Sequence, residues 1–221
     1  MNVALAILWK DLATEWRGRD RVVAMAVFSF LVVVVLHFAL PARDAEEARR
    51  LAPGLLWVAY IFAAILGLNR AFALELENEA LAGLALAPAD RGWIFLGKAA
   101  ASFVILGAVQ AVTAVVFALA FDVDLAAIAP SLAIVVALGS LGICAVGTLL
   151  GAVSVRTRYR EVMLPLLMLP LLVPVLLAAV DATAGLLETG TLRWRSVQLL
   201  LVTDAVFWIV SFTSFEYVLD E

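Results

Sequence analysis

Uninterrupted apolar stretches recur along nearly the whole chain, and each is about as long as the roughly 20 residues that a bilayer-crossing helix needs. Charged residues make up only 15% of the chain, against about 25% in soluble domains. No segment remains that is long enough to build a separate soluble core. We therefore expect an all-α polytopic membrane protein in which residues 1–221 form one transmembrane domain, because helices satisfy their own backbone hydrogen bonds in lipid.

Six of these runs are long enough to cross a membrane. The first follows a segment of mixed charge that is too long for the n-region of a signal peptide, so we expect an uncleaved helix. The fourth exceeds what a ~30 Å hydrocarbon core requires and must tilt, bend or protrude. The expected spans are about 22–40, 53–69, 93–121, 125–155, 162–180 and 197–219.

Lys and Arg are distributed unequally between the two sides of these spans. If the N-terminus lies inside, ten of them are cytoplasmic and five are outside. The positive-inside rule then favours a cytoplasmic N-terminus and C-terminus. The outside loops are short, so any activity that needs a soluble domain must come from a partner chain.

Residues 3–17 have the pattern of an amphipathic helix at the membrane interface. Its apolar face is formed by Leu5, Leu8, Trp9, Leu12 and Trp16. Lys10 and Arg17 fall on the opposite face. Two interpretations stay open: a surface anchor that orients the first span, or a docking element for a cytoplasmic partner.

The longest polar interruption of the chain predicts a short cytoplasmic coupling helix at about 74–87, which Pro88 ends. Such a helix can seat in a groove of a partner and transmit a rigid push, although a solvated loop helix is the alternative. The candidate docking residues are Glu75, Glu77, Glu79, Leu81 and Leu84.

Within the membrane, Gly139, Gly147 and Gly151 recur at multiples of four residues and predict a face for close helix packing. Asp204 and Gln110 are the polar side chains placed deepest in the spans. We expect each of them to face protein or water, either as a structural hydrogen bond to a neighbouring helix or as part of a substrate path.

The fifth span contains three prolines, Pro165, Pro170 and Pro174, within the segment LPLLMLPLLVP. Each proline removes a backbone donor and favours a bend. The helix is expected to be either a permanently kinked wedge or an element that moves during gating.

Catalytic and metal-binding patterns are missing from the sequence. Residues 92–99 nearly spell a phosphate-binding loop but have Ala99 where magnesium needs Ser or Thr, and no strand precedes them. His37 has no acid or cysteine near it in sequence, and the lone Cys144 cannot form an internal disulfide. We expect a chain that is not an enzyme and that holds no metal.

Four sequence segments together resemble the haem exporter protein B (CcmB) family, the permease subunit of the cytochrome c maturation transporter. They are APGLLWVA from Ala52, GLNRAF from Gly67, the LALAP that ends at Pro88, and the three-proline segment that ends at Pro174. The likeness covers nearly the whole chain and implies the fold of an ABC-2-type exporter permease.

The resemblance also implies a bacterial inner-membrane location and a set of partners. These are a cytoplasmic ATPase subunit (A), a haem-handling membrane subunit (C), a small membrane subunit (D) and a periplasmic haem chaperone (E), with a second permease copy and lipid but no nucleic acid. It places ATP and haem on the partners, so this chain binds no cofactor. A generic exporter permease for a lipid, drug or polysaccharide is the alternative function.

Overall fold

The computed structural model describes residues 3–40, 45–77, 90–154 and 160–220, and these form seven helices and no strand. Six of the seven are long and apolar enough to cross a membrane, which confirms the all-α fold with six spanning helices. The helices are α1 (Val3–Gly18), α2 (Asp20–Ala39), α3 (Ala45–Glu77), α5 (Arg91–Phe121), α6 (Ala129–Ser154), α7 (Arg160–Thr189) and α8 (Trp194–Asp220).

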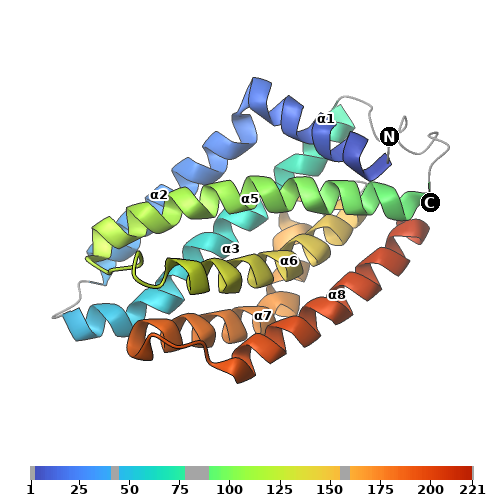
Figure 1. Ribbon diagram of the computed structural model, residues 1–221. Coiled ribbons are helices and arrows are strands. Elements are labelled where there is room, and N and C mark those ends of the chain that lie inside the picture. The colour runs from blue at the N-terminus through green and yellow to red at the C-terminus, as the bar shows by residue number, and fades with distance from the viewer. Residues whose placement is uncertain (1–2, 41–44, 78–89, 155–159, 221) are drawn as a thin grey trace.

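The spanning helices run in alternating directions, so that both termini lie at one end of the bundle (Figure 1). We call this end the termini end; it contains the starts of α2, α5 and α7 and the ends of α3, α6 and α8. The opposite end is called the far end. Helix α1 does not run with the bundle but lies across the first part of α5 at the termini end (Figure 1).

A sharp turn separates α1 from α2 and sends α1 back over α5. Arg19 makes this turn with φ 58°, a left-handed conformation that is uncommon for a residue other than glycine. The carboxylate of Glu15 accepts a hydrogen bond of 2.8 Å from the backbone N–H of Val22, in the first turn of α2. Donors at a helix start lack partners within the helix, so this contact fastens the two helices together.

Several helices extend beyond the apolar runs that predicted them. Helix α3 begins at Ala45 and continues past Asn69 to Glu77, so Pro53 lies inside it rather than at its start. Helix α7 continues to Thr189, beyond the expected end of its span at residue 180. An apolar run marks only the part of a helix that faces lipid, whereas the backbone hydrogen bonds continue into the polar residues on either side.

The connection between α5 and α6 is longer than the gap between the expected spans 93–121 and 125–155. Helix α5 ends at Phe121 and α6 begins only at Ala129. In between, Asp122 adopts φ 51°, and the carboxylate of Asp124 accepts hydrogen bonds of 3.1 and 3.3 Å from the N–H groups of Ala126 and Ala127. These contacts make an Asx-type turn ahead of the helix.

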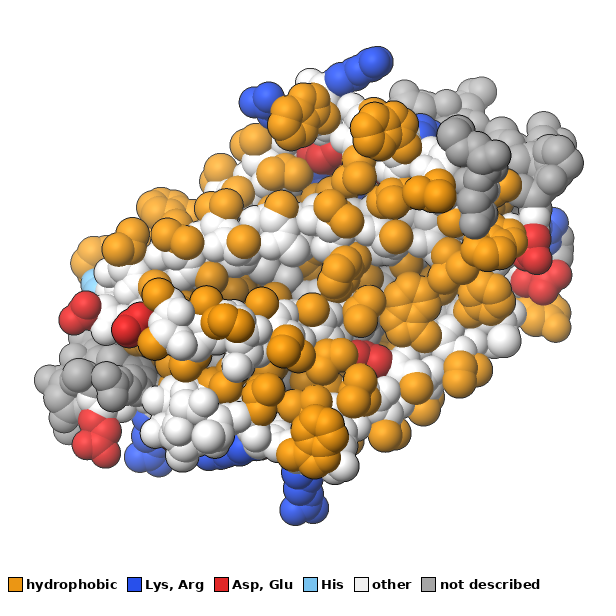
Figure 2. Space-filling model, viewed as in Figure 1, with side chains coloured by type: hydrophobic (Ala, Val, Ile, Leu, Met, Phe, Trp, Pro, Cys, Tyr) orange, Lys and Arg blue, Asp and Glu red, His pale blue; other side chains and the backbone are white. Residues whose placement is uncertain are grey.

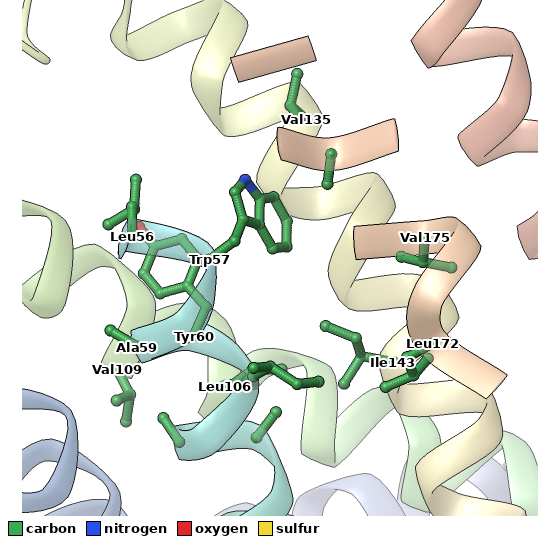
Figure 3. Packing of buried hydrophobic residues seen from close by; sticks show 14 of the residues in the cluster. Leu56, Trp57, Ala59, Tyr60, Leu106, Val109, Val135, Ile143, Leu172 and Val175 are labelled. Atoms are coloured by element: carbon green, nitrogen blue, oxygen red, sulfur yellow. The ribbon is translucent and has the colours of Figure 1, made fainter. Parts of the chain in front are cut away.

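Helix α3 occupies the centre of the bundle, and 72% of its spanning segment is buried. Its two largest buried side chains, Trp57 and Tyr60, pack edge to face with ring centroids 5.6 Å apart. Figure 3 shows both rings within the apolar core, with the Trp57 indole beside Val135 of α6. The indole N–H donates a hydrogen bond of 3.0 Å to the hydroxyl of Thr183 in α7, so one side chain ties α3 to α7.

Candidate functional site

The junction of α1 with α5 at the termini end is built around a glycine. A Cβ added at Gly97 would lie 2.7 Å from the backbone carbonyl of Ala4 and 2.8 Å from the Cβ of Ile7. The absence of a side chain at this position therefore lets the two helix backbones approach closely. Opposite this contact, Trp9 is 75% and Trp16 is 78% exposed. Helix α1 thus presents an aromatic face outward, which is the face expected of an interfacial helix.

Buried charges reinforce the same junction. The ammonium of Lys98 in α5 pairs with the carboxylate of Asp11 in α1 at 3.4 Å, and the Lys98 side chain is only 6% exposed. Beside it, the buried Arg21 of α2 donates a hydrogen bond of 3.2 Å to Ser102 of α5. A buried charge is costly unless it is paired. The Lys98–Asp11 pair joins α1 to α5, and the Arg21–Ser102 hydrogen bond joins α2 to α5, while Nε of Arg21 has no partner in the described chain.

This charged cluster was not among the sequence-based site predictions. A signal for the cluster exists, since a lysine in the first turns of a long apolar run needs an acidic partner if protein covers it. The sequence does not say that α1 is the element that covers it.

The predicted coupling segment lies mostly outside the described residues. Glu79, Leu81 and Leu84 are not described, whereas residues 75 and 77 belong to the last turns of α3. No break separates the central span from this segment up to Glu77. The segment around 75–77 is therefore the direct continuation of the most buried helix of the bundle.

The predicted packing glycines lie on the buried face of α6. A Cβ at Gly139 would lie 2.4 Å from the Trp57 ring, and one at Gly147 would lie 2.3 Å from a methyl group of Leu68. Gly151 is buried as well. Both close contacts are with α3, so α6 approaches the central helix along this stripe.

The two predicted intramembrane polar residues lie on opposite sides of α6. The side-chain carbonyl of Gln110 accepts a hydrogen bond of 2.8 Å from Ser140 of α6. Asp204 is 6% exposed and faces Gly142 of the same helix, where an added Cβ would lie 2.4 Å from its Oδ1. Neither Asp204 oxygen has a hydrogen-bond partner within the described part of the chain. The expected structural hydrogen bond therefore forms at Gln110 but not at Asp204.

The prolines of α7 do not face the core. Pro170 and Pro174 are exposed, and Pro165 is half-buried. The buried face of this helix is formed by Leu164, Met168, Leu172 and Val175. The missing backbone donors of Pro170 and Pro174 therefore fall on the outer side of the helix, and that of Pro165 falls between the outer side and the core.

An ion-pair cluster closes the far end of the bundle between α7 and α8. Arg193 donates to the carboxylate of Asp181 and, at 2.6 Å, to that of Glu188. Asp181 also accepts a hydrogen bond from the hydroxyl of Ser196. The α7–α8 turn, which includes Gly190 at φ 68°, is thus fastened on both sides.

Residues 92–99, which resemble a phosphate-binding loop, and the single histidine, His37, both have structural roles. Residues 92–99 are helical, and the carboxylate of Asp90 already caps the helix start by accepting 2.9 Å from the N–H of Gly92. His37 is in the last turn of α2, where its ring packs edge-on against Phe121 with centroids 5.5 Å apart. No group of acidic, His or Cys side chains able to hold a metal occurs in residues 3–40, 45–77, 90–154 and 160–220.

Comparison with known proteins identifies the family. The family model described as "CcmB protein" matches residues 2–216. The chain belongs to the CcmB family. "Heme exporter protein B" of Paracoccus denitrificans is 32% identical over 80% of either chain, and its namesake from Rhodobacter capsulatus is 29% identical over 95% of either chain. A third, from Pseudomonas aeruginosa, is 27% identical over 95% of this chain and 96% of its own.

The CcmB membership agrees with the resemblance carried by the sequence motifs. In this CcmB protein, two of those motifs have clear structural places. The APGLLW motif supplies Trp57 to the centre of the core. The three-proline motif supplies the exposed Pro170 and Pro174 of α7 together with part of its buried face. The protein is a multi-pass membrane protein with both termini at one end of the bundle (Figure 1).

Proposed function

We propose that this CcmB protein is the membrane permease subunit of an ATP-binding-cassette complex for cytochrome c biogenesis. In this role it couples ATP hydrolysis by a partner to haem export or to release of the haem-loaded periplasmic chaperone. The observation that carries the proposal is the family match over residues 2–216, together with six apolar helices that span the same region. The relatives named "Heme exporter protein B" support a haem-related substrate.

The arrangement at the start of α5 supports placing ATP on a partner chain. Phosphates bind at a helix start through unpaired backbone N–H groups after a glycine-rich turn. Here Asp90 takes that position with its own negative charge, and bulky side chains such as Trp93 and Phe95 follow. Haem likewise belongs to the partners in this proposal, since the lone His37 sits against aromatic rings with no second ligand described nearby.

The continuity of α3 supports a role in transmitting force. The helix has 33 residues, or roughly 50 Å at ~1.5 Å per residue. It reaches from the far end through the core to Glu77 and so contains the first two predicted docking residues, Glu75 and Glu77. A partner that binds around residues 75–77 would therefore push directly on the helix that carries Trp57. The contacts that join α1 and α2 to α5 give that push a frame.

The proposed partners are those of the cytochrome c maturation system. They are the ATPase subunit (A) at the termini end, the haem-handling membrane subunit (C), the small membrane subunit (D), the periplasmic chaperone (E) and a second permease copy. In this proposal the termini end is cytoplasmic and the membrane is the bacterial inner membrane. The far end, with its short connections, then faces the periplasm.

Complementation tests the function. Expression of this chain in a bacterium that lacks its own haem exporter protein B is expected to restore covalently haem-stained cytochromes c, and the tagged chain is expected to co-purify with the ATPase subunit. Export of a lipid, drug or polysaccharide without cytochrome c maturation would instead support the generic exporter.

A docking variant tests the coupling segment. Leu81→Asp is expected to abolish co-purification of the ATPase subunit while the chain remains in the membrane, because a carboxylate buried in an interface without a partner costs several kcal/mol. Leu81→Met, which keeps the side chain apolar, is the matched control. Full retention of the ATPase by Leu81→Asp would remove this segment from the interface.

A further inference from the structure

A long apolar groove runs between α5 and α6 and has no occupant among the described residues. Its volume is about 580 Å³. The two walls are made largely of small side chains, among them Gly107, Ala111 and Ala114 of α5 and Ala129, Ala133 and Ala137 of α6. Figure 2 shows the face over α5 and α6, which carries mostly apolar side chains and backbone. We call this feature the α5/α6 groove.

One buried polar group lines the groove without a full set of partners. Gln110 is 1% exposed and belongs to the groove lining together with Ser140 and Tyr60. Its side-chain carbonyl accepts from Ser140 at 2.8 Å, while Tyr60 donates at 3.1 Å to its backbone carbonyl. Its side-chain nitrogen Nε2 has no partner in the described chain. If the Gln110 amide is flipped, Nε2 can donate to Ser140, but the side-chain oxygen then has no partner, because Ser140 can pair with only one end of the amide.

The depth of Gln110 restricts what can supply the missing partner. It lies roughly 17 Å along α5 from Phe121 at ~1.5 Å per residue, which is near the middle of a ~30 Å hydrocarbon core. Phospholipid carbonyls belong to the interfacial region, and acyl chains at mid-depth carry no polar atom. An unsatisfied amide in hydrocarbon costs a few kcal/mol. A protein helix can bring a polar side chain to this depth.

The small side chains of the groove walls also favour a helix as the occupant. Ala129, Ala133 and Ala137 repeat every four residues, and small residues at that spacing let helix backbones approach closely in lipid. A second copy of this chain is a poorer fit. If two copies were paired groove to groove, bulky side chains of the lining would meet, for example Leu119, which is 81% exposed, and Val115, which is 62% exposed.

We propose that the α5/α6 groove seats a membrane-spanning helix of a different membrane subunit. That helix presents small residues at four-residue spacing and a Ser, Thr, Asn or Gln side chain that hydrogen-bonds the Gln110 amide. The inference rests on the proposed function only for the identity of the candidate subunits, which are the other membrane subunits of the complex. The ATPase binds elsewhere, at the termini end.

Groove-filling variants test the site in the assembled complex. Ala111→Leu and Ala133→Leu place bulk in the groove at exposed positions, so the fold itself does not have to change. We expect a loss of about tenfold in the co-purified membrane subunit for each, with the ATPase subunit retained. Ala108→Leu is the matched control, because Ala108 is exposed on α5 but does not line the groove. Gln110→Leu is expected to lower the yield roughly threefold to tenfold, the range for one interhelical hydrogen bond in a membrane.

Photocrosslinking from position 133 identifies the occupant. A benzophenone amino acid there, in native membranes, is expected to form an adduct that maps to a spanning helix of the other membrane subunit, within one turn of a Ser, Thr, Asn or Gln. Adducts with a second copy of this chain, or with lipid alone, would overturn the inference. So would unchanged co-purification in Ala111→Leu and Ala133→Leu. These results leave the proposed function intact as long as the ATPase subunit co-purifies, whereas failure of the wild-type chain to retain the ATPase refutes the proposed function itself.

Discussion

The contact between Gly139 of α6 and Trp57 of α3 predicts that one added methyl group destabilises the bundle core. The Cβ of Gly139→Ala would lie 2.4 Å from Cη2 and 2.8 Å from Cζ3 of the indole. The ring must therefore move by about 1 Å to reach an ordinary carbon–carbon distance of about 3.5 Å. The indole cannot swing away freely, because its N–H is held by Thr183.

The loss in free energy of unfolding caused by Gly139→Ala can be estimated from three contributions. Overpacking a filled core costs about 1–3 kcal/mol, and loss of the Trp57–Thr183 hydrogen bond adds about 1 kcal/mol. Replacing a helical glycine by alanine returns up to about 1 kcal/mol. We expect a net destabilisation of about 1–3 kcal/mol. Gly54→Ala is the matched control, because no atom lies within 4 Å of its added Cβ and only the propensity gain applies.

Unfolding by SDS in mixed micelles, followed by circular dichroism, measures both variants. The double variant Gly139→Ala with Trp57→Phe is informative as well, since the smaller ring leaves room for the methyl group and should give a favourable coupling of at least about 1 kcal/mol. Equal stability of Gly139→Ala and Gly54→Ala would refute the close approach of α6 to α3.

Four further predictions follow from other contacts. Gly97→Val is expected to displace α1 from α5, because the blocking atom is a backbone oxygen, and protease cleavage of α1 in membranes should rise several-fold while Gly54→Val leaves it unchanged. Asp204→Asn is expected to keep or raise stability in the SDS assay, since it removes a carboxyl group that has no partner in the described chain. A clear loss of stability would mean that the carboxyl group is bound by a residue outside that part of the chain. Replacing the three α7 prolines by alanine should leave complex assembly intact and, if bending is used in the cycle, lower cytochrome c maturation; normal maturation would mean that the prolines only shape packing. His37→Ala is expected to leave the haem spectrum of the complex and cytochrome c maturation unchanged, and a lost absorption band would make this chain a direct haem ligand.

The number and type of helices could be predicted from the sequence because lipid imposes one simple rule, that about 20 apolar residues must be helical. The helix ends could not, because α3 continues to Glu77 without regard to where its apolar run ends. Polar residues at depth, such as Gln110 and Asp204, were also visible in the sequence. The sequence does not show which of the two has a hydrogen-bond partner, since that depends on which face of α6 each side chain contacts.

The α5/α6 groove and the Arg193 cluster show the limits of sequence reasoning in a different way. The groove is formed by alanines that are unremarkable in any single helix and become a surface only when two helices lie side by side. The Arg193 cluster joins charges from α7 and the α7–α8 turn, which look like ordinary loop residues one by one. Both features are properties of pairs of elements.

The hydrogen bond between Trp57 and Thr183 has a consequence for how the chain is made. Its two residues are 126 positions apart, so the ribosome has synthesised α5 and α6 before α7 exists to accept the indole N–H. Chains fold from the N-terminus during synthesis at about 5–20 residues per second. For several seconds the central helix therefore lies in the membrane while the indole N–H of Trp57 has no hydrogen-bond partner. A chain truncated after Ser154 would keep Trp57 in that immature state permanently, and we expect quality-control proteases to remove it.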